Sequence, residues 1–184
     1  MNPNEIPQRW GADKIIDNLW VGSFQSSMNF FPLTEHGITH IINCTYEFEC
    51  KFPKKFKYMH IKLRDQTHQY IIDIFPKAID FISKAFEKDG SVLIHCGNGS
   101  SRSGTIAAAY VLFKFNAQKK YSFDVTSTIA FLKSKRPKIQ PNPGFIEQLS
   151  LFYHLGCTLP MSFTPEHENL LKKYRLRAEI ILIE

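Results

Sequence analysis

The sequence has few cysteines, and they follow no recognisable pattern. The four that it contains, Cys44, Cys50, Cys96 and Cys157, stand at irregular intervals. This spacing excludes the paired ligands of a structural zinc site and a dense framework of disulfides. We therefore interpret the cysteines as reduced thiols.

Long apolar runs are also missing. No stretch approaches the roughly 20 residues that a membrane-spanning helix needs. Residues 1–5 are polar, whereas a secretion signal would be basic and then apolar. We expect no membrane partner, and a location in the cytoplasm or, by diffusion, the nucleus.

Charge of one sign is not concentrated in long runs. The chain has 23 basic and 17 acidic residues and a net charge of +6, which favours anionic partners in general. The basic residues are scattered, however, and do not interleave with aromatic residues as they do on nucleic-acid-binding surfaces. We therefore expect no nucleic acid partner. The short basic stretch 133–138 is interpreted as the solvated end of a helix rather than a nuclear signal.

The pattern of the remaining residues predicts one α/β domain. The chain has 184 residues, of which 43% are hydrophobic, enough for a sizeable core. Short β-branched runs alternate with longer helical segments, which predicts a central, mostly parallel sheet of about five strands flanked by helices. We place a loose lead-in at residues 1–12, the domain at 13–157 and an extension at 158–184. Strands are expected at 14–21 (two pieces joined by a turn at Asp17 and Asn18), 39–44, 57–63 and 91–94, and helices at 26–36, 71–88, 105–112, from a cap at Ser122 to Pro137, and from a cap at Asn142 to Gly156.

The extension is harder to interpret. Thr164, Pro165 and Glu166 have the residue types that begin a short helix. Residues 180–183 are all apolar. We expect them to pack either on the domain or on a partner chain, and the sequence does not choose between these, nor does it give the oligomeric state.

The stretch from His95 to Gly104 lies between an apolar strand and a buried helix. A tight loop at a helix N-terminus directs backbone N–H groups inward and favours a bound anion. The same field favours the thiolate of Cys96, which makes it a nucleophile, and the planar fork of Arg102 can hold a phosphate. These residues predict a site that binds a phosphoryl group and attacks it with Cys96. The phosphate-binding residues would be Gly97, Asn98, Gly99, Ser100, Ser101 and Arg102.

Two other interpretations of this stretch compete with that prediction. A cysteine that follows an apolar strand is most often only a buried thiol. The arginine six positions later, between a strand and a helix, favours the chemical interpretation. A Walker loop is excluded because it needs Gly-Lys-Ser/Thr at the helix start, whereas here the charge is Arg102, directly after Ser101.

Phosphoryl transfer to a thiol also needs a proton donor for the leaving oxygen. The best candidate is Asp65, which follows the predicted strand 57–63 in a loop that can lean over the site. His68 in the same loop is an alternative, although a loop histidine is more often simply solvated. Ser103 is placed to hydrogen-bond the thiolate, in addition to capping the helix, and His95 is expected to orient the loop rather than to transfer protons.

With these motifs in place, the chain resembles the small dual-specificity protein phosphatases of the cysteine-based tyrosine phosphatase superfamily. The resemblance runs along most of residues 13–156 and implies the three-layer sandwich of that family. Besides the loop, it includes Leu19-Trp20-Val21-Gly22-Ser23, Gly37-Ile38-Thr39-His40-Ile41-Ile42-Asn43, Asp65 followed by Ile71 and Phe75, Arg136-Pro137, Pro141-Asn142-Pro143-Gly144-Phe145, and Gln148-Leu149.

The resemblance implies phosphorylated protein substrates and a two-step mechanism that uses no metal ion or cofactor. Cys96 would take the phosphoryl group while Asp65 protonates the leaving alcohol or phenol, and Asp65 would then act as the base for water. The loop lacks the lysine of similar phosphoinositide phosphatases, which disfavours a lipid substrate. Two alternatives stay open: the same fold acting on an RNA 5′-phosphate or a phosphoglucan, or a non-catalytic phosphate-binding module.

The resemblance also suggests a role for Cys44. In some relatives a cysteine on a neighbouring strand forms a reversible disulfide with the nucleophile and protects it from further oxidation. Cys44 is therefore a candidate redox partner of Cys96. Simple burial without a redox role is the favoured interpretation.

Overall fold

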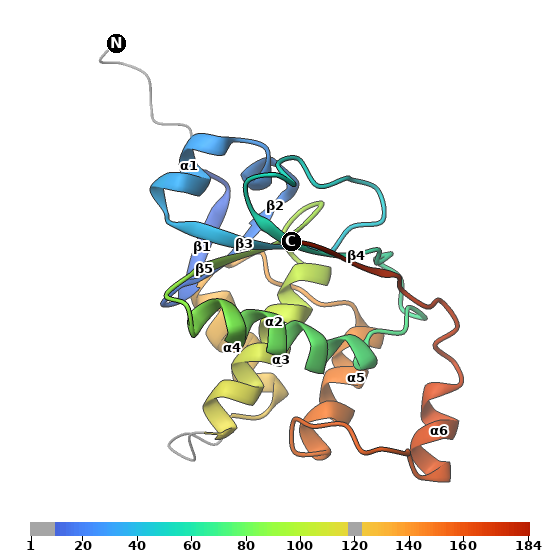
Figure 1. Cartoon of the computed structure of the whole chain (residues 1–184). Helices are drawn as coiled ribbons and strands as arrows, with labels where there is room; N and C mark the ends of the chain where they lie inside the picture. The colour runs from blue at the N-terminus through green and yellow to red at the C-terminus, as the bar shows by residue number, and fades with distance from the viewer. Residues whose placement is uncertain (1–9, 118–122) are drawn as a thin grey trace.

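The described part of the chain folds around one sheet. The computed structural model describes residues 10–117 and 123–184, and within them six strands pair in the order β1-β2-β5-β3-β4-β6 (Figure 1). The four inner strands run parallel and the two outer strands are antiparallel to their neighbours. Their bounds are β1 Ala12–Ile16, β2 Leu19–Ser23, β5 Ser91–Cys96, β3 Ile38–Asn43, β4 Lys57–Ile61 and β6 Ile180–Ile183. This confirms the predicted α/β class and mostly parallel sheet, with one strand more than the expected five.

Helices cover both faces of the sheet. The larger layer holds α2 (Phe75–Phe86), α3 (Arg102–Ala117), α4 (Val125–Lys135) and α5 (Pro143–His154), and the other face carries α1 (Phe30–Glu35). Residues 102–112 of α3 are all buried, as expected of a helix that is apolar on all sides. None of the helices in the described ranges is long and apolar enough to span a membrane.

The central strand β5 shows why the sheet needs two covering layers. All six of its residues are buried, which is typical of a parallel strand between helices. Val92 and Ile94 belong to the large core under α2 and α3. Leu93 points the other way and packs with Ile41 and Tyr58 in the smaller core on the α1 side. The carboxyl end of β5 is thereby fixed on both faces where the chain enters the loop after Cys96.

Several local predictions are confirmed, with shifted boundaries. The turn between β1 and β2 is at Asn18, whose φ of 63° is tolerated by asparagine. The predicted helix 26–36 is divided into a 3₁₀ turn η1 (Phe24–Ser27) and α1, because Asn29 caps a new helix. The predicted helix 71–88 begins as a 3₁₀ turn η2 (Ile72–Ile74) before α2, which has a proline in its first turn.

The cap of α4 differs from the prediction. Ser122 lies outside the described residues, and the helix is capped by Asp124 instead. The carboxylate of Asp124 accepts hydrogen bonds from the backbone N–H and the hydroxyl of Ser127, at 2.7 and 2.6 Å. The hydroxyl of Ser127 lies 3.0 Å from the backbone nitrogen of Asp124 and completes a reciprocal capping box. The predicted cap of α5 is confirmed, since Asn142 accepts from the N–H of Phe145.

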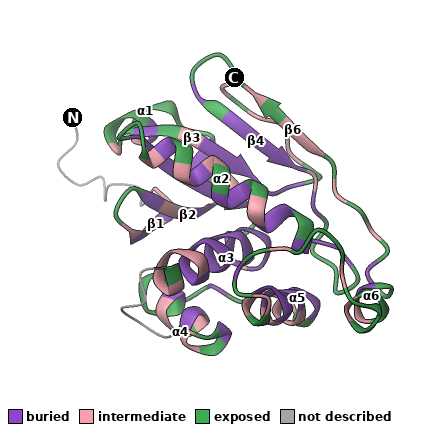
Figure 2. Ribbon diagram, turned by 60° about the horizontal axis from the view of Figure 1, so that its bottom comes forward, coloured by how far each residue is buried: buried purple, intermediate pink, exposed green. Residues whose placement is uncertain are grey.

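The extension folds back onto the domain. Thr164 caps a short helix α6 (Pro165–Leu171), which lies beside α5, and the chain then returns to β4 (Figure 2). There β6 pairs antiparallel with β4, with Tyr58 opposite Ile183 and Ile61 opposite Ile180. Of the two expectations for residues 180–183, the structure therefore has the segment packed on its own domain.

Candidate active site

The loop after β5 is formed by five residues, 97–101, between Cys96 and the start of α3 at Arg102. Gly99 has a φ of +67°, and a Cβ at this position would lie 2.5 Å from the backbone carbonyl of Gly22 on β2. Only glycine combines this left-handed conformation with such a close approach. The loop, called the phosphate loop below, therefore packs its backbone directly against the neighbouring strand.

Two hydrogen-bond donors point at the sulfur of Cys96. The side chain is almost completely buried, and its Sγ accepts from the N–H of Gly99 at 3.3 Å and from the hydroxyl of Ser103 at 3.2 Å. Donors interact more strongly with an anionic acceptor than with a neutral one. This geometry fits the predicted roles of Cys96 and Ser103.

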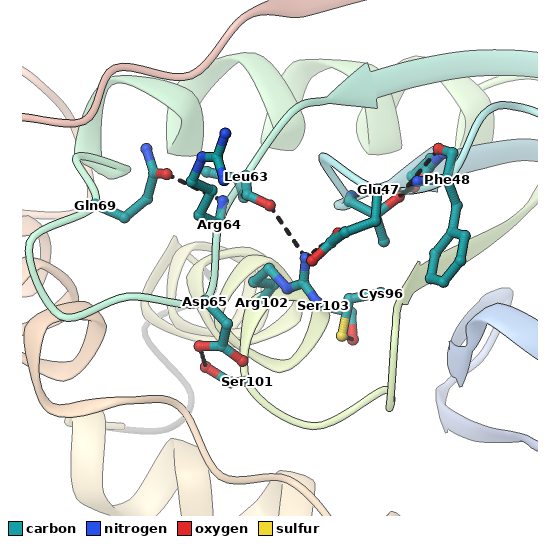
Figure 3. A network of polar contacts seen from close by, with 12 residues as sticks. Glu47, Phe48, Leu63, Arg64, Asp65, Gln69, Cys96, Ser101, Arg102 and Ser103 are labelled. Atoms are coloured by element: carbon teal, nitrogen blue, oxygen red, sulfur yellow. Dashed lines mark hydrogen bonds and ion pairs between the residues drawn. The ribbon is translucent and has the colours of Figure 1, made fainter.

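Arg102 is held by one edge of its guanidinium. Its Nη1 donates to the carboxylate of Glu47 at 2.7 Å and to the carbonyl of Leu63 at 3.1 Å (Figure 3). Its Nη2 lies on the side of Gly97, at 3.2 Å from where a Cβ on that glycine would be. Its Nε is buried and has no hydrogen-bond partner among the described residues. The edge formed by Nε and Nη2 is the one that can hold two oxygens of a phosphate.

Glu47 and Arg102 keep each other charged. Burial of the guanidinium opposes its charge, but Glu47 and Cys96 raise the pKa of Arg102 above its ordinary value. Burial likewise raises the pKa of Glu47, but the hydrogen bond and charge of Arg102 outweigh this and lower it below the ordinary value. Sequence reasoning missed Glu47, because a single acidic residue in the irregular segment between β3 and β4 carries no pattern.

Asp65 lies over the phosphate loop. Its Oδ1 accepts from the hydroxyl of Ser101 at 2.7 Å and from the side-chain amide of Asn142 at 2.9 Å. A cavity of about 350 Å³ brings the predicted acid, nucleophile and arginine together. It is lined by Asp65, Cys96, Asn98, Ser100, Ser101, Arg102, Gln140, Pro141, Asn142 and Pro143.

Arg136 fixes the outer side of the phosphate loop. Its guanidinium donates to the carbonyls of Gly99 at 2.7 Å and Asn98 at 3.3 Å, and it is anchored by the carboxylate of Asp13 at 2.6 Å. These bonds fix the backbone carbonyls of Asn98 and Gly99 on this side of the loop. The interpretation of 133–138 as a solvated helix end is therefore wrong at Arg136, which is only 3% exposed. The lysines at 133, 135 and 138 are exposed.

The hydroxyls of two loop serines that line the cavity are engaged by other residues. The hydroxyl of Ser101 donates to Asp65 and accepts from the N–H of Asn142 at 3.1 Å. The hydroxyl of Ser100 donates to the carbonyl of Lys138. Both hydroxyls thus have protein partners, and the prediction that the backbone of this loop binds a phosphate stays a prediction. The link from Asn142 to Asp65 was missed, since the sequence indicated only its role as a helix cap.

His95 and His68 have different surroundings. His95 is 1% exposed, and burial, aided by repulsion from His60, lowers its pKa to about 3. It is thus neutral at physiological pH, which fits an orienting role better than proton transfer. His68 is exposed and does not line the cavity, so it is not brought to the site as an alternative acid.

Cys44 lies next to the nucleophile across the sheet. Asn43 is opposite His95 in the β3–β5 pairing, and the N–H of Cys44 donates to the carbonyl of His95 at 2.8 Å. Cys44 is fully buried. Burial, and secondarily the charge of Cys96, raise the pKa of the Cys44 thiol well above its ordinary value. Cys44 is therefore a neutral thiol.

Comparisons with known proteins identify the family of the domain that carries this site. The family model of the dual specificity phosphatase catalytic domain matches residues 19–154. Dual specificity protein phosphatase 19 of Mus musculus is 35% identical over 134 residues, which are 73% of this chain and 58% of that protein. Dual specificity protein phosphatase 1 of Arabidopsis thaliana is 34% identical over 135 residues, which are 73% of this chain and 65% of that protein. The chain thus spans less than two thirds of either relative.

Solved structures show the same fold. The crystal structure of DUSP15 has a TM-score of 0.74 and 26% identity, and the match covers 89% of this chain and 96% of that one. The human tyrosine phosphatase-like serine/threonine/tyrosine-interacting protein has a TM-score of 0.73 and 28% identity, with 80% and 98% covered. From the matched domain, the shared sheet and the site built on it, we conclude that this chain belongs to the dual specificity phosphatase family of cysteine-based protein tyrosine phosphatases.

Proposed function

We propose that this protein is a cysteine-dependent protein phosphatase that hydrolyses phosphotyrosine and phosphoserine or phosphothreonine. The observation that carries the proposal is the convergence of Cys96, Arg102 and Asp65 on one cavity. A cavity of about 350 Å³ is at the small end of ligand pockets, which suits the phosphorylated end of a side chain. The absence of lysine from the loop sequence supports a protein rather than a phosphoinositide substrate.

In the first step, the thiolate of Cys96 attacks phosphorus. The S–P bond forms as the bond to the substrate oxygen breaks, and the carboxylic acid of Asp65 gives its proton to that oxygen. Arg102 and the loop N–H groups hold the three remaining oxygens, where negative charge is concentrated. The products are a neutral alcohol or phenol and a phosphorylated Cys96.

In the second step, water replaces the thiolate. The Asp65 carboxylate takes a proton from the water as the P–O bond forms and the S–P bond breaks. The hydroxyl of Ser103, 3.2 Å from Sγ, donates to the departing sulfur and stabilises its returning charge. Inorganic phosphate leaves, and Asp65 is again protonated for the next turnover.

The proposal is tested by turnover of 4-nitrophenyl phosphate in the presence of a chelator, with phosphopeptides as the second substrate class. We expect activity in the wild type, a loss of at least about 1000-fold in Cys96→Ser, and no change in Cys50→Ser, whose thiol lies outside the cavity. An inactive wild type that still binds a phosphopeptide would indicate a binding module. Turnover of RNA 5′-phosphates or phosphoglucan in preference to phosphopeptides would overturn the substrate class.

We also propose that Cys44 is a redox partner of Cys96. Neighbouring strands lie about 5 Å apart, within the range of Cα separations that a disulfide spans. Hydrogen peroxide would oxidise the Cys96 thiolate to a sulfenic acid with release of hydroxide. The Cys44 thiol would then attack that sulfur and release water. Mass mapping of peroxide-treated protein should give a peptide pair linked through Cys44 and Cys96, and its absence would exclude this role.

A further inference from the structure

The segment that carries Asp65 has little regular structure of its own. Residues 64–68 are all exposed, and the segment 64–70, called the acid loop below, lies between β4 and η2. Exposed loops are mobile unless other parts of the chain hold them. An acid that must meet the leaving oxygen therefore needs external support.

Gln69 supports the acid loop from within. This side chain is 1% exposed, and its Oε1 accepts from the N–H of Arg64 at 3.0 Å, directly before Asp65 (Figure 3). Its Nε2 donates to the carbonyls of Tyr70 at 3.2 Å and of Leu176 at 2.5 Å. The same amide thus closes the acid loop and ties it to the C-terminal extension.

The backbone of the extension adds further contacts. The N–H of Tyr70 donates to the carbonyl of Leu176 at 2.9 Å, and the N–H of Arg175 donates to the carbonyl of His68 at 3.0 Å. Arg177 places its guanidinium carbon 3.7 Å from the ring centre of Tyr70. The extension therefore runs along the end of the acid loop and holds it through both backbone and side chain.

A second contact holds the chain just before the acid loop. The N–H of Lys62 donates to the carbonyl of Glu179 at 2.9 Å, and the side chains of the two residues form an ion pair of 3.1 Å. Between Tyr70 and Lys62, the extension spans the whole acid loop.

Helix α5 holds the opposite side of the loop. A Cβ on Gly144 would lie 1.8 Å from the carbonyl oxygen of Thr67, so the helix and the loop touch backbone to backbone. The amide of Gln148 donates to the carbonyl of Gln69 at 2.9 Å and accepts from the N–H of Ile71 at 2.8 Å. These α5 residues lie within the part of the chain that matches the family, 19–154, whereas the extension lies outside it.

We propose that residues 174–179 of the extension are a positioning strap for the acid loop, and that Gln69 transmits their hold to the backbone beside Asp65. The inference rests on the proposed function, because it assigns the strap to the proton transfer of that reaction. Gln69 is a positioning residue and does not touch the substrate. The strap selects the orientation of Asp65 and leaves phosphate binding to the phosphate loop.

The test compares two aryl phosphates with different leaving groups. Departure of 4-nitrophenol needs little help from an acid, whereas departure of phenol needs much. In Gln69→Ala we expect kcat/KM for phenyl phosphate to fall about tenfold and kcat/KM for 4-nitrophenyl phosphate to fall less than twofold, because kcat/KM covers only the steps up to phosphorylation of Cys96, in which Asp65 acts as the acid. Arg177→Ala should lower kcat/KM for phenyl phosphate about threefold and again leave 4-nitrophenyl phosphate almost unaffected.

A matched control and a double variant separate positioning from general stability. Lys173→Ala removes an exposed cation of the same extension, whose ion pair of 2.6 Å is with Glu147 on α5 rather than with the acid loop; we expect wild-type kinetics. In the Asp65→Asn background, Gln69→Ala should cause no further loss, because the group that it positions is gone.

The outcomes distinguish the two proposals. If the wild type turns over neither substrate, the proposed function is wrong. If the wild type is active but both variants slow the two substrates equally, or if Gln69→Ala slows phenyl phosphate further in the Asp65→Asn background, the strap is only structural. Arg177 is largely exposed, so Arg177→Ala is expected to fold. If a thermal scan shows that Gln69→Ala does not fold, the kinetics of Arg177→Ala decide whether the strap positions the acid loop.

Discussion

The phosphate loop and the acid loop supply the two halves of the proposed chemistry from opposite kinds of structure. The donors on Cys96 come from Gly99 and Ser103, three and seven positions away. The partners of the acid loop come from Ser101, Asn142 and Leu176, at separations of 36, 77 and 107 positions. A nucleophile can thus be prepared by a short local sequence, whereas an acid is aimed by distant parts of the fold.

The largest difference between the two loops should appear when the acid of the acid loop is removed. Asp65→Asn keeps the shape of the side chain and an oxygen that can accept from Ser101. Hydrolysis of substrates with poor leaving groups should slow by about 10²–10⁴-fold, the usual contribution of general acid catalysis. Hydrolysis of substrates with good leaving groups should slow little. Measurement of kcat/KM against leaving-group acidity checks this, because kcat/KM excludes the second step, in which Asp65 acts as the base for every substrate; Asp80→Asn on the surface of α2 is the control. Equal slowing of all substrates would point to a different acid.

Disruption of the phosphate loop should give the opposite pattern. Arg102→Lys keeps the charge but loses the planar fork, and its loss acts on the phosphoryl group that all substrates share. We expect kcat/KM to fall by about 10²–10³-fold for good and poor leaving groups alike. Arg175→Lys, at an exposed position, is the control. A loss confined to poor leaving groups would remove the distinction between the two loops.

The support beneath the phosphate loop should be sensitive to acid. Because the folded-state pKa of His95, about 3, lies below its ordinary value of 6.5, protonation favours the unfolded chain. The contribution of neutral, buried His95 to the free energy of unfolding is complete above about pH 6.5 and declines as the pH falls toward 3. Urea unfolding should show a loss of about 2 kcal/mol from this group between pH 7 and 5.

The His95 contribution is isolated by comparing variants. His95→Gln should show a shallower dependence of unfolding free energy on pH over this interval, even if its stability at pH 7 is lower. His68→Gln, at an exposed position in the acid loop, should keep the wild-type slope. An unchanged slope in His95→Gln would show that other groups carry the acid sensitivity.

The smallest expected effect concerns the acidic residue that holds Arg102. Glu47→Gln keeps the shape but removes the charge at 2.7 Å from Nη1. Leu63 still binds that nitrogen, and Glu47 is half-exposed, so we expect only a 3- to 10-fold loss of kcat/KM, the same for all leaving groups. Glu49→Gln, two positions along the same segment, should have no effect. A faster variant would mean that Glu47 mainly repels the substrate.

The contrast between the two loops also explains which site residues can be predicted from the sequence. The phosphate loop is predictable because strand, glycine, arginine and helix start are contiguous, and Asp65 because it follows a recognisable strand. Glu47 and the contact of Arg136 with the phosphate loop were missed because each is a single charged residue whose partner is 55 or 37 positions away. The contact of the extension with Gln69 was also missed, because the extension contributes only the backbone carbonyl of Leu176, which every residue type carries.

The sixth strand has a consequence for solubility rather than for catalysis. Without it, β4 would present its unpaired N–H and C=O groups along one side of a strand whose residues 58–61 are all buried in the fold. An edge of that kind is a template for pairing with other chains. With β6 in place, the open edge is a strand of four residues between Glu179 and Glu184, whose charges discourage a second copy from adding to the sheet.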